Sequence, residues 1–159
     1  MSPSGRFLER RVLAAFCLIA TFALLPVGGP SQAHEGATGA VKERQQGMIA
    51  LKEAMKAWKT ALESPDGPKP DAIDAIAVRL SENAGARLLS LFPENGPTRH
   101  TDAVPEIWTD WKTFSRLAND LEERALSLQK AKADKVVLRS EFQTVGMICK
   151  ACHERFRKP

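Results

Sequence analysis

The sequence predicts an all-α protein, an antiparallel four-helix bundle, on three observations. Ala, Leu, Lys, Glu and Arg dominate the 159 residues and favour helices, whereas Tyr is absent and runs of β-branched residues are few. Apolar residues recur at steps of three and four in four stretches, and no segment alternates with period two over a useful length. Proline and glycine separate the stretches, so the helices are joined by short connections.

The first two helices are expected over residues 38–62 and 70–91. The first has an apolar seam on one face, because its apolar positions, with one arginine among them, recur at steps of three and four. Pro65 and Gly67 end it, and Pro70 is a good first-turn residue for the second helix. Phe92-Pro93 stops the second helix. The seam of the first helix comprises Val41, Arg44, Met48, Leu51, Met55, Trp58 and Leu62.

The other two helices are expected over residues 105–128 and 134–156. Pro105 and Glu106 suit a first turn, since proline fits there and an acid favours the positive end of a helix. Asp134 is the expected N-cap of the last helix. The large aromatic side chains of these helices and of the first are expected in the core, namely Trp58, Trp108, Trp111 and Phe142.

Residues 1–33 have the features of a secretory signal peptide. Arginines precede an apolar run, Val12–Leu25, which at 14 residues is shorter than the ~20 that span a bilayer. Small residues at Ser31 and Ala33 predict cleavage after Ala33. The mature domain is then expected over residues 34–159, without membrane contact once the leader is removed. That domain has 126 residues and a net charge of +2, because the leader contains three arginines and one glutamate. A nearly neutral domain disfavours nucleic-acid binding.

The last helix contains Cys149-Lys150-Ala151-Cys152-His153, the C-x-x-C-H sequence to which c-type haem is attached. Positions i, i+3 and i+4 share a helix face, so both sulfurs can form thioethers with the haem vinyl groups while the imidazole reaches the iron. A redox disulfide, half of a zinc site and a structural disulfide are alternatives for C-x-x-C alone. The first lacks a βαβ pattern, and the second lacks another Cys or His pair. The adjacent histidine, the export signal and the helical setting favour haem.

The segment from Cys149 to Arg157, close to the C-terminus, resembles the haem end of the cytochrome c′ family, the class II c-type cytochromes. The resemblance implies a four-helix bundle with one covalently attached haem c and its iron. It implies thioether bonds at Cys149 and Cys152 and an axial ligand at His153. It covers essentially the whole mature chain and extends to Val41-Lys42-Glu43-Arg44-Gln45, Leu91-Phe92-Pro93 and Ala103-Val104-Pro105-Glu106-Ile107-Trp108.

The resemblance also assigns a role to Met48, four residues after Arg44. In cytochromes c′ proper an apolar residue here leaves the iron five-coordinate and open to small gases, whereas a low-spin branch has methionine here as the sixth ligand. The sequence therefore resembles the low-spin, Met-ligated branch, although periodicity alone favours Met48 as core packing. Met55, two turns further along the same face, is the alternative ligand, and Met147 is expected to pack.

Three polar residues are expected around the haem. A charge on an apolar seam needs a partner, and haem propionates would supply one to Arg44, with Gln45 beside it. A solvent-facing arginine is the other interpretation. The resemblance implies that Arg157 lies near the proximal imidazole, while a cation that complements the helix C-terminus is an equal alternative. His34 and His100 are expected in solvent.

These observations predict a periplasmic one-electron carrier that uses a His/Met-ligated haem and transforms no substrate. No H-E-x-x-H, phosphate-binding glycine loop or G-x-S-x-G indicates an enzyme. The expected partners are redox proteins, and dimers are common in the family that the chain resembles, so a homodimer is a further expectation. The alternative function is binding of nitric oxide or carbon monoxide at a five-coordinate iron.

Overall fold

The computed structural model describes residues 37–94, 96, 99–131 and 133–159. The predicted signal peptide and its cleavage site lie outside these residues. The described part of the chain forms six helices and no strand. They are α1 (Gly39–Glu63), α2 (Pro70–Ser81), α3 (Gly85–Ser90), α4 (Glu106–Thr109), α5 (Trp111–Leu128) and α6 (Lys135–Phe156).

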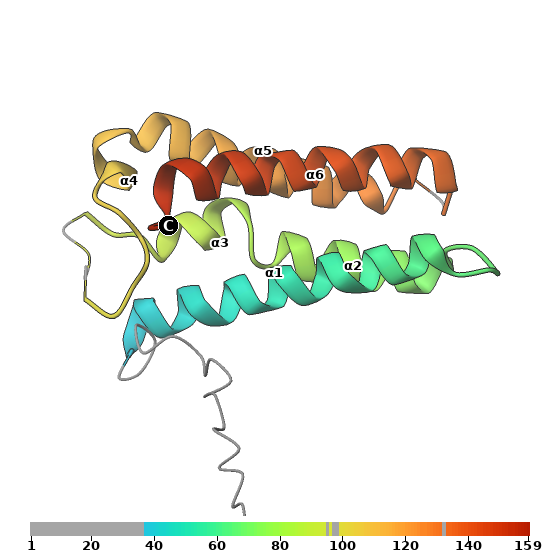
Figure 1. Ribbon diagram of the computed structural model, residues 1–159, viewed down its shortest axis with the longest axis horizontal. Helices are drawn as coiled ribbons and strands as arrows, with labels where there is room; N and C mark the ends of the chain where they lie inside the picture. Colours follow the sequence, from blue (N-terminus) through green and yellow to red (C-terminus); the bar gives the residue numbers. More distant parts are fainter. Residues whose placement is uncertain (1–36, 95, 97–98, 132) are drawn as a thin grey trace, which may run out of the picture.

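The four long helices form the antiparallel bundle that the sequence predicts (Figure 1). The helix α1 packs against α2 and α6, and α5 packs against α2, α3 and α6. Successive long helices run in opposite directions, so the C-terminal end of α6 lies at the same end of the bundle as the beginning of α1 (Figure 1). None of the helices in the described part of the chain combines the length and apolarity that a bilayer crossing requires.

The predicted single helix over residues 70–91 is wrong, because the chain turns between α2 and α3. The amides of Asn83 and Ala84 bond to carbonyls three residues back, and Gly85 then adopts a left-handed φ of +49°. A side chain at Gly85 would collide with the carboxylate of Glu122 on α5. The turn therefore brings the backbone of α3 close to α5, a contact that helical periodicity does not reveal.

The helix predicted from residue 105 is also interrupted, at Asp110. This residue leaves the helical conformation, with φ −125° and ψ 51°, and its carboxylate accepts from the amide of Thr113 at 3.4 Å. Asp110 thus caps a new helix, α5. The prediction that Trp111 is a core aromatic is wrong, because this residue begins α5 at the surface and is 39% exposed.

The last helix begins as predicted. The Oδ1 atom of Asp134 accepts from the amides of Val136 at 2.8 Å and Val137 at 3.0 Å. Such a cap satisfies donors that have no partner within the helix. The start of α6 is therefore fixed 14 residues before Cys149, and the C-x-x-C-H sequence falls on its last turns.

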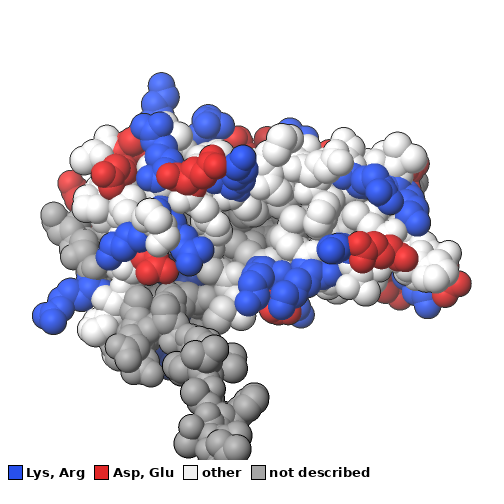
Figure 2. Space-filling view, viewed as in Figure 1, with Lys and Arg blue, Asp and Glu red and all other residues white. Residues whose placement is uncertain are grey.

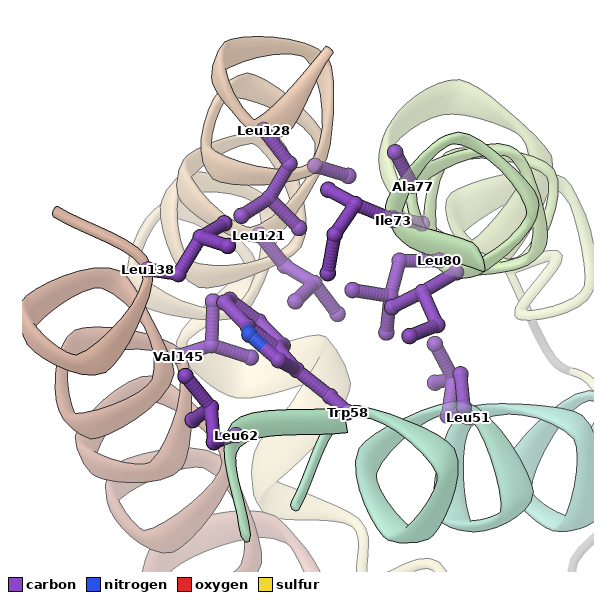
Figure 3. Close-up of a cluster of buried hydrophobic side chains, with 14 residues drawn as sticks. Leu51, Trp58, Leu62, Ile73, Ala77, Leu80, Leu121, Leu128, Leu138 and Val145 are labelled. Atoms are coloured by element: carbon purple, nitrogen blue, oxygen red, sulfur yellow. The ribbon is translucent and has the colours of Figure 1, made fainter. Parts of the chain in front are cut away.

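Buried side chains form two clusters rather than one continuous core. The first surrounds Trp58, which is completely buried, and receives residues from α1, α2, α5 and α6 (Figure 3). The ring of Phe142 meets that of Trp58 edge-to-face at 5.4 Å between centres. The second cluster lies nearer α3 and α4 and comprises Leu88, Leu91, Phe92, Ile107, Phe114, Leu117, Ala118 and Phe156. A bundle that divides its core in this way has a boundary between the clusters, where the candidate site lies.

Candidate haem site

The two cysteines of C-x-x-C-H lie on α6 at the boundary between the clusters. Cys149 is half-buried and packs against the first cluster, whereas Cys152 is half-buried and packs against the second. Both are free thiols, so neither disulfide interpretation is realised in this structure. His153 is exposed on the next position of the helix. Among the described residues no group of three or more His, Cys, Asp or Glu is placed to hold a metal ion, which removes the zinc interpretation there.

Burial sets the protonation of these groups. It raises the pKa of the Cys149 thiol, and together with the neighbouring Cys149 it raises the pKa of Cys152 to about 11. Partial desolvation lowers the pKa of His153, and the positive charge of Arg157 lowers it further. The thiols are therefore protonated and the imidazole is neutral near pH 7, and a neutral imidazole is the form that ligates a metal.

Met48 lies at the same boundary, on α1. Its half-buried side chain packs against both clusters, and Ile148, next to Cys149, is the residue of α6 that does the same. Met55 packs against the first cluster only. Met147, which the sequence predicts to pack, is instead 62% exposed. Of the three methionines considered as ligands or packing residues, Met48 is the one that packs against both clusters.

Arg44 is buried, which excludes the solvent-facing interpretation. Only 4% of its surface is exposed, its Nε donates to the carbonyl of Leu91 at 2.6 Å, and its guanidinium lies 4.1 Å from the centre of the Phe92 ring. Burial lowers the pKa of Arg44. One residue further on, the Nε2 of Gln45 donates to the carbonyl of His100 at 3.2 Å. Both side chains therefore bind the segment that follows α3, one turn of α1 before Met48.

Arg157 ends α6 and ties it to the segment before α4. Its amide donates to the carbonyl of His153 at 3.2 Å, and its guanidinium lies 3.4 Å from the carboxylate of Asp102. Arg157 also pairs with Ala103 in an isolated antiparallel bridge. No sequence pattern indicates Asp102 as the partner, because 55 residues separate it from Arg157. His100 is exposed, as expected.

The donor set at this boundary fits a covalently attached haem. Two thiols three residues apart and an adjacent imidazole occupy one face of one helix, as thioether attachment and axial ligation require. A thioether from Met48 lies between apolar clusters on the facing helix, where a flat apolar macrocycle would be shielded from water. Ile148, directly before Cys149, also packs against both clusters and is not among the residues predicted from the sequence.

Comparison with known proteins identifies the family of the chain. Residues 39–157 match the family model described as Cytochrome C'. The chain belongs to the cytochrome c′ family. A cytochrome c′ of Rhodocyclus tenuis is 33% identical over 74% of this chain and 92% of its own length. Cytochrome c-556 of Agrobacterium tumefaciens is 27% identical over 75% of this chain and 97% of its own. The crystal structure of cytochrome c′ from Thermochromatium tepidum matches with a TM-score of 0.65 at 28% identity, over 76% of this chain and 95% of that one.

Membership of the cytochrome c′ family establishes the general properties of the protein. Members carry covalently bound haem c with its iron. They are periplasmic proteins that carry electrons or bind gases through haem, and they are not classical enzymes. Some cytochromes c′ of known structure are homodimers. The protein is accordingly a c-type haem protein of a family whose members transfer electrons or bind gases.

Proposed function

We propose that this cytochrome is a periplasmic one-electron carrier of the low-spin, Met-ligated branch, formed by residues 34–159 after the signal peptide is removed. Cys149 and Cys152 hold the haem through thioethers, and His153 and Met48 are its axial ligands. The observation that supports Met48 is its place at the boundary of the two clusters, facing the helix that contains the two thiols. No substrate is transformed, so the protein is not an enzyme.

The ligands divide the work between two helices. Haem iron, when bound, accepts and releases one electron by changing between the ferric and ferrous states. Cys149 and Cys152 fix the macrocycle to α6, and His153 supplies a neutral imidazole from the same face. Met48 supplies a soft thioether from α1, which raises the reduction potential relative to a harder ligand. Because both helices are packed into one bundle, the ligands keep their places when the charge changes.

Two arginines and one neutral amide support the site. Arg44 and Gln45 bind the haem propionates, and the bond of Arg44 to Leu91 orients its guanidinium. Arg157 lies near the proximal imidazole, held by Asp102 at the C-terminal end of α6. We propose that its partners are redox proteins and that the protein forms either a monomer or a homodimer.

Replacing Met48 by leucine tests the proposal. Leucine has a similar volume, so the packing cost should stay below about 1.5 kcal/mol, while the soft donor is lost. We expect a low-spin spectrum for the natural protein. The Met48→Leu variant should be high-spin, bind carbon monoxide readily and have a lower potential. Met55→Leu and Met147→Leu are matched controls that should leave the spectrum unchanged.

The competing function is gas binding at a five-coordinate iron. The observation in its favour is that Met48 packs against apolar residues on both sides, as a purely structural methionine would. A high-spin spectrum of the natural protein, with rapid binding of carbon monoxide, would assign that function. A low-spin spectrum that Met48→Leu leaves unchanged would instead move the sixth ligand to another residue, with Met55 tested next.

A further inference from the structure

Basic residues are concentrated on the two helices that contain the candidate haem ligands. The helix α1 contains five basic and three acidic side chains, and α6 contains four basic and two acidic ones, so each has a net charge of +2. The helices α2, α3, α4 and α5 have net charges of −1, +1, −1 and 0. The positive charge of the bundle therefore lies on α1 and α6, which pack side by side.

On each of these helices several of the exposed cations lie on one side. In α1, Lys52, Lys56 and Lys59 follow one another at steps of four and three. In α6, Arg139 and Lys150 are 11 residues apart, three helical turns, and thus on one side. Both groups are exposed. Figure 2 shows the side of the molecule on which α1 and α6 lie in front, with Lys and Arg along the middle of the lower helix and uncharged surface between the two helices.

These cations lie beside the candidate ligands. Lys52 comes one helical turn after Met48, and Lys150 lies between Cys149 and Cys152. Gly146 lies one turn before Cys149, and no neighbouring side chain lies within 4 Å of the position that a Cβ would occupy there. The surface next to the Cys149 thiol is therefore open. Six exposed cations on and directly after these helices are called the α1–α6 basic face. They are Lys52, Lys56, Lys59, Arg139, Lys150 and Arg157.

The ion pairs of this face are exposed to solvent. Glu53 lies 3.9 Å from Lys52 and 3.0 Å from Lys56, and the pairs Lys59–Glu63 and Lys150–Glu154 measure 3.8 and 3.6 Å. Exposed pairs of this kind contribute about 0–1 kcal/mol each, so the cations can exchange their own carboxylates for those of a partner at little cost. Counting Asp102 beside Arg157, six cations face four carboxylates, a net charge of +2.

We propose that the α1–α6 basic face is the docking surface for an acidic patch on a redox partner protein. This inference rests on the proposed electron-carrier function, because the face lies on the two helices that contain the candidate haem ligands. Complementary charge speeds encounter and orients the partner without requiring tight binding, which suits a carrier that must also leave. The four interspersed carboxylates fit a protein surface with charges of both signs better than the uniform negative charge of a nucleic acid or an anionic membrane.

The test reverses one exposed charge on each helix, with Lys52→Glu combined with Arg139→Glu. The matched control is Lys112→Glu with Lys130→Glu, which changes the net charge equally at exposed sites on α5 and the following turn. The haem-loaded proteins in the ferrous state are mixed with ferricyanide, an anionic oxidant, or with the cationic oxidant tris(phenanthroline)cobalt(III). In a third reaction, the haem-loaded proteins in the ferric state are mixed with a reduced acidic plant-type ferredoxin. At low salt we expect the face variant to react about 10-fold more slowly with ferricyanide and ferredoxin and faster with the cation.

The control should change each rate less than about 2-fold, and the difference should vanish near 1 M salt, where the Debye length is about 3 Å. Equal rates for the face variant and the control would overturn the docking surface while leaving the electron carrier intact. A high-spin natural protein that exchanges electrons slowly with every reagent would instead defeat the proposed function. Co-sedimentation with phosphatidylglycerol vesicles that depends on Lys52 and Arg139, with unchanged ferredoxin rates, would assign the face to a membrane and overturn the proposal.

Discussion

Replacing Arg44 by methionine perturbs the buried cation of the site. Methionine keeps an unbranched apolar stem but loses the 2.6 Å hydrogen bond to Leu91 and the cation–π contact with Phe92. A hydrogen bond from a charged group is worth about 1.5–3 kcal/mol, and a desolvated cation–π contact about 2 kcal/mol. Relief from burying a charge offsets part of this loss. We expect the free energy of unfolding to fall by about 2 kcal/mol.

Thermal unfolding of the haem-loaded protein, followed by far-ultraviolet circular dichroism, measures this change. In a domain of this size about 2 kcal/mol lowers Tm by roughly 10 °C. Arg79→Met, at an exposed position on α2, is the matched control and should cost about 0.5 kcal/mol or less. If Arg44→Met costs no more than Arg79→Met, the contacts with Leu91 and Phe92 make no net contribution, and the reasoning from them is refuted.

The same variant separates a structural role of Arg44 from the proposed role at the propionates. Loss of a cation beside these carboxylates raises their pKa values, and it lowers the reduction potential because the ferric state is no longer disfavoured by the nearby positive charge. The haem should stay covalently attached. A destabilised variant with the natural pH dependence of its potential would show that Arg44 supports the segment after α3 but does not bind the propionates.

Two further predictions concern attachment and folding. The double variant Cys149→Ser with Cys152→Ser should yield little haem-loaded protein. Extraction of the natural protein with acid–acetone should leave the haem on the chain, because thioether bonds survive this treatment. Pigment in the organic layer would contradict covalent attachment. Gly85→Ala should lower the free energy of unfolding by about 2 kcal/mol in a denaturant titration, because alanine is strained at φ +49° and its Cβ meets Glu122. Combination with Glu122→Ala should recover part of this loss, and no recovery would mean that backbone strain accounts for all of it.

The sequence predicted the parts of the fold that local physics determines. The seam of α1 is buried as its period of three and four residues indicates, with Val41, Leu51, Trp58 and Leu62 in the interior. Asp134 caps α6 because its short carboxylate reaches the next amides. The breaks before α3 and at Asp110 were not predicted, since each depends on a partner elsewhere in the chain or on one residue's conformation. Nothing in the residues from Pro70 to Leu91 indicates that Glu122 will lie against Gly85.

The candidate site likewise contains residues that could be predicted from the sequence and residues that could not. Cys149, Cys152 and His153 could be identified from their spacing, because one turn of helix places all three on one face. The partners of Arg44 could not, since Leu91 is 47 residues away and is brought to α1 only when α3 folds back. Trp111 was assigned to the core on periodicity, yet the cap at Asp110 starts α5 there and leaves its ring at the surface.

Met48 shows why a ligand is harder to predict than an attachment site. Periodicity places Met48 and Met55 on the same seam and cannot choose between them. The choice comes from tertiary packing, which divides the core and leaves Met48 in contact with both clusters while Met55 touches one. A continuous core would have given both methionines the same surroundings. The division of the core is therefore the structural feature on which the electron-carrier proposal depends. Substitution of Met48 tests that proposal more sharply than any change to the haem attachment sequence, because both competing functions require the thioethers and only one requires the methionine.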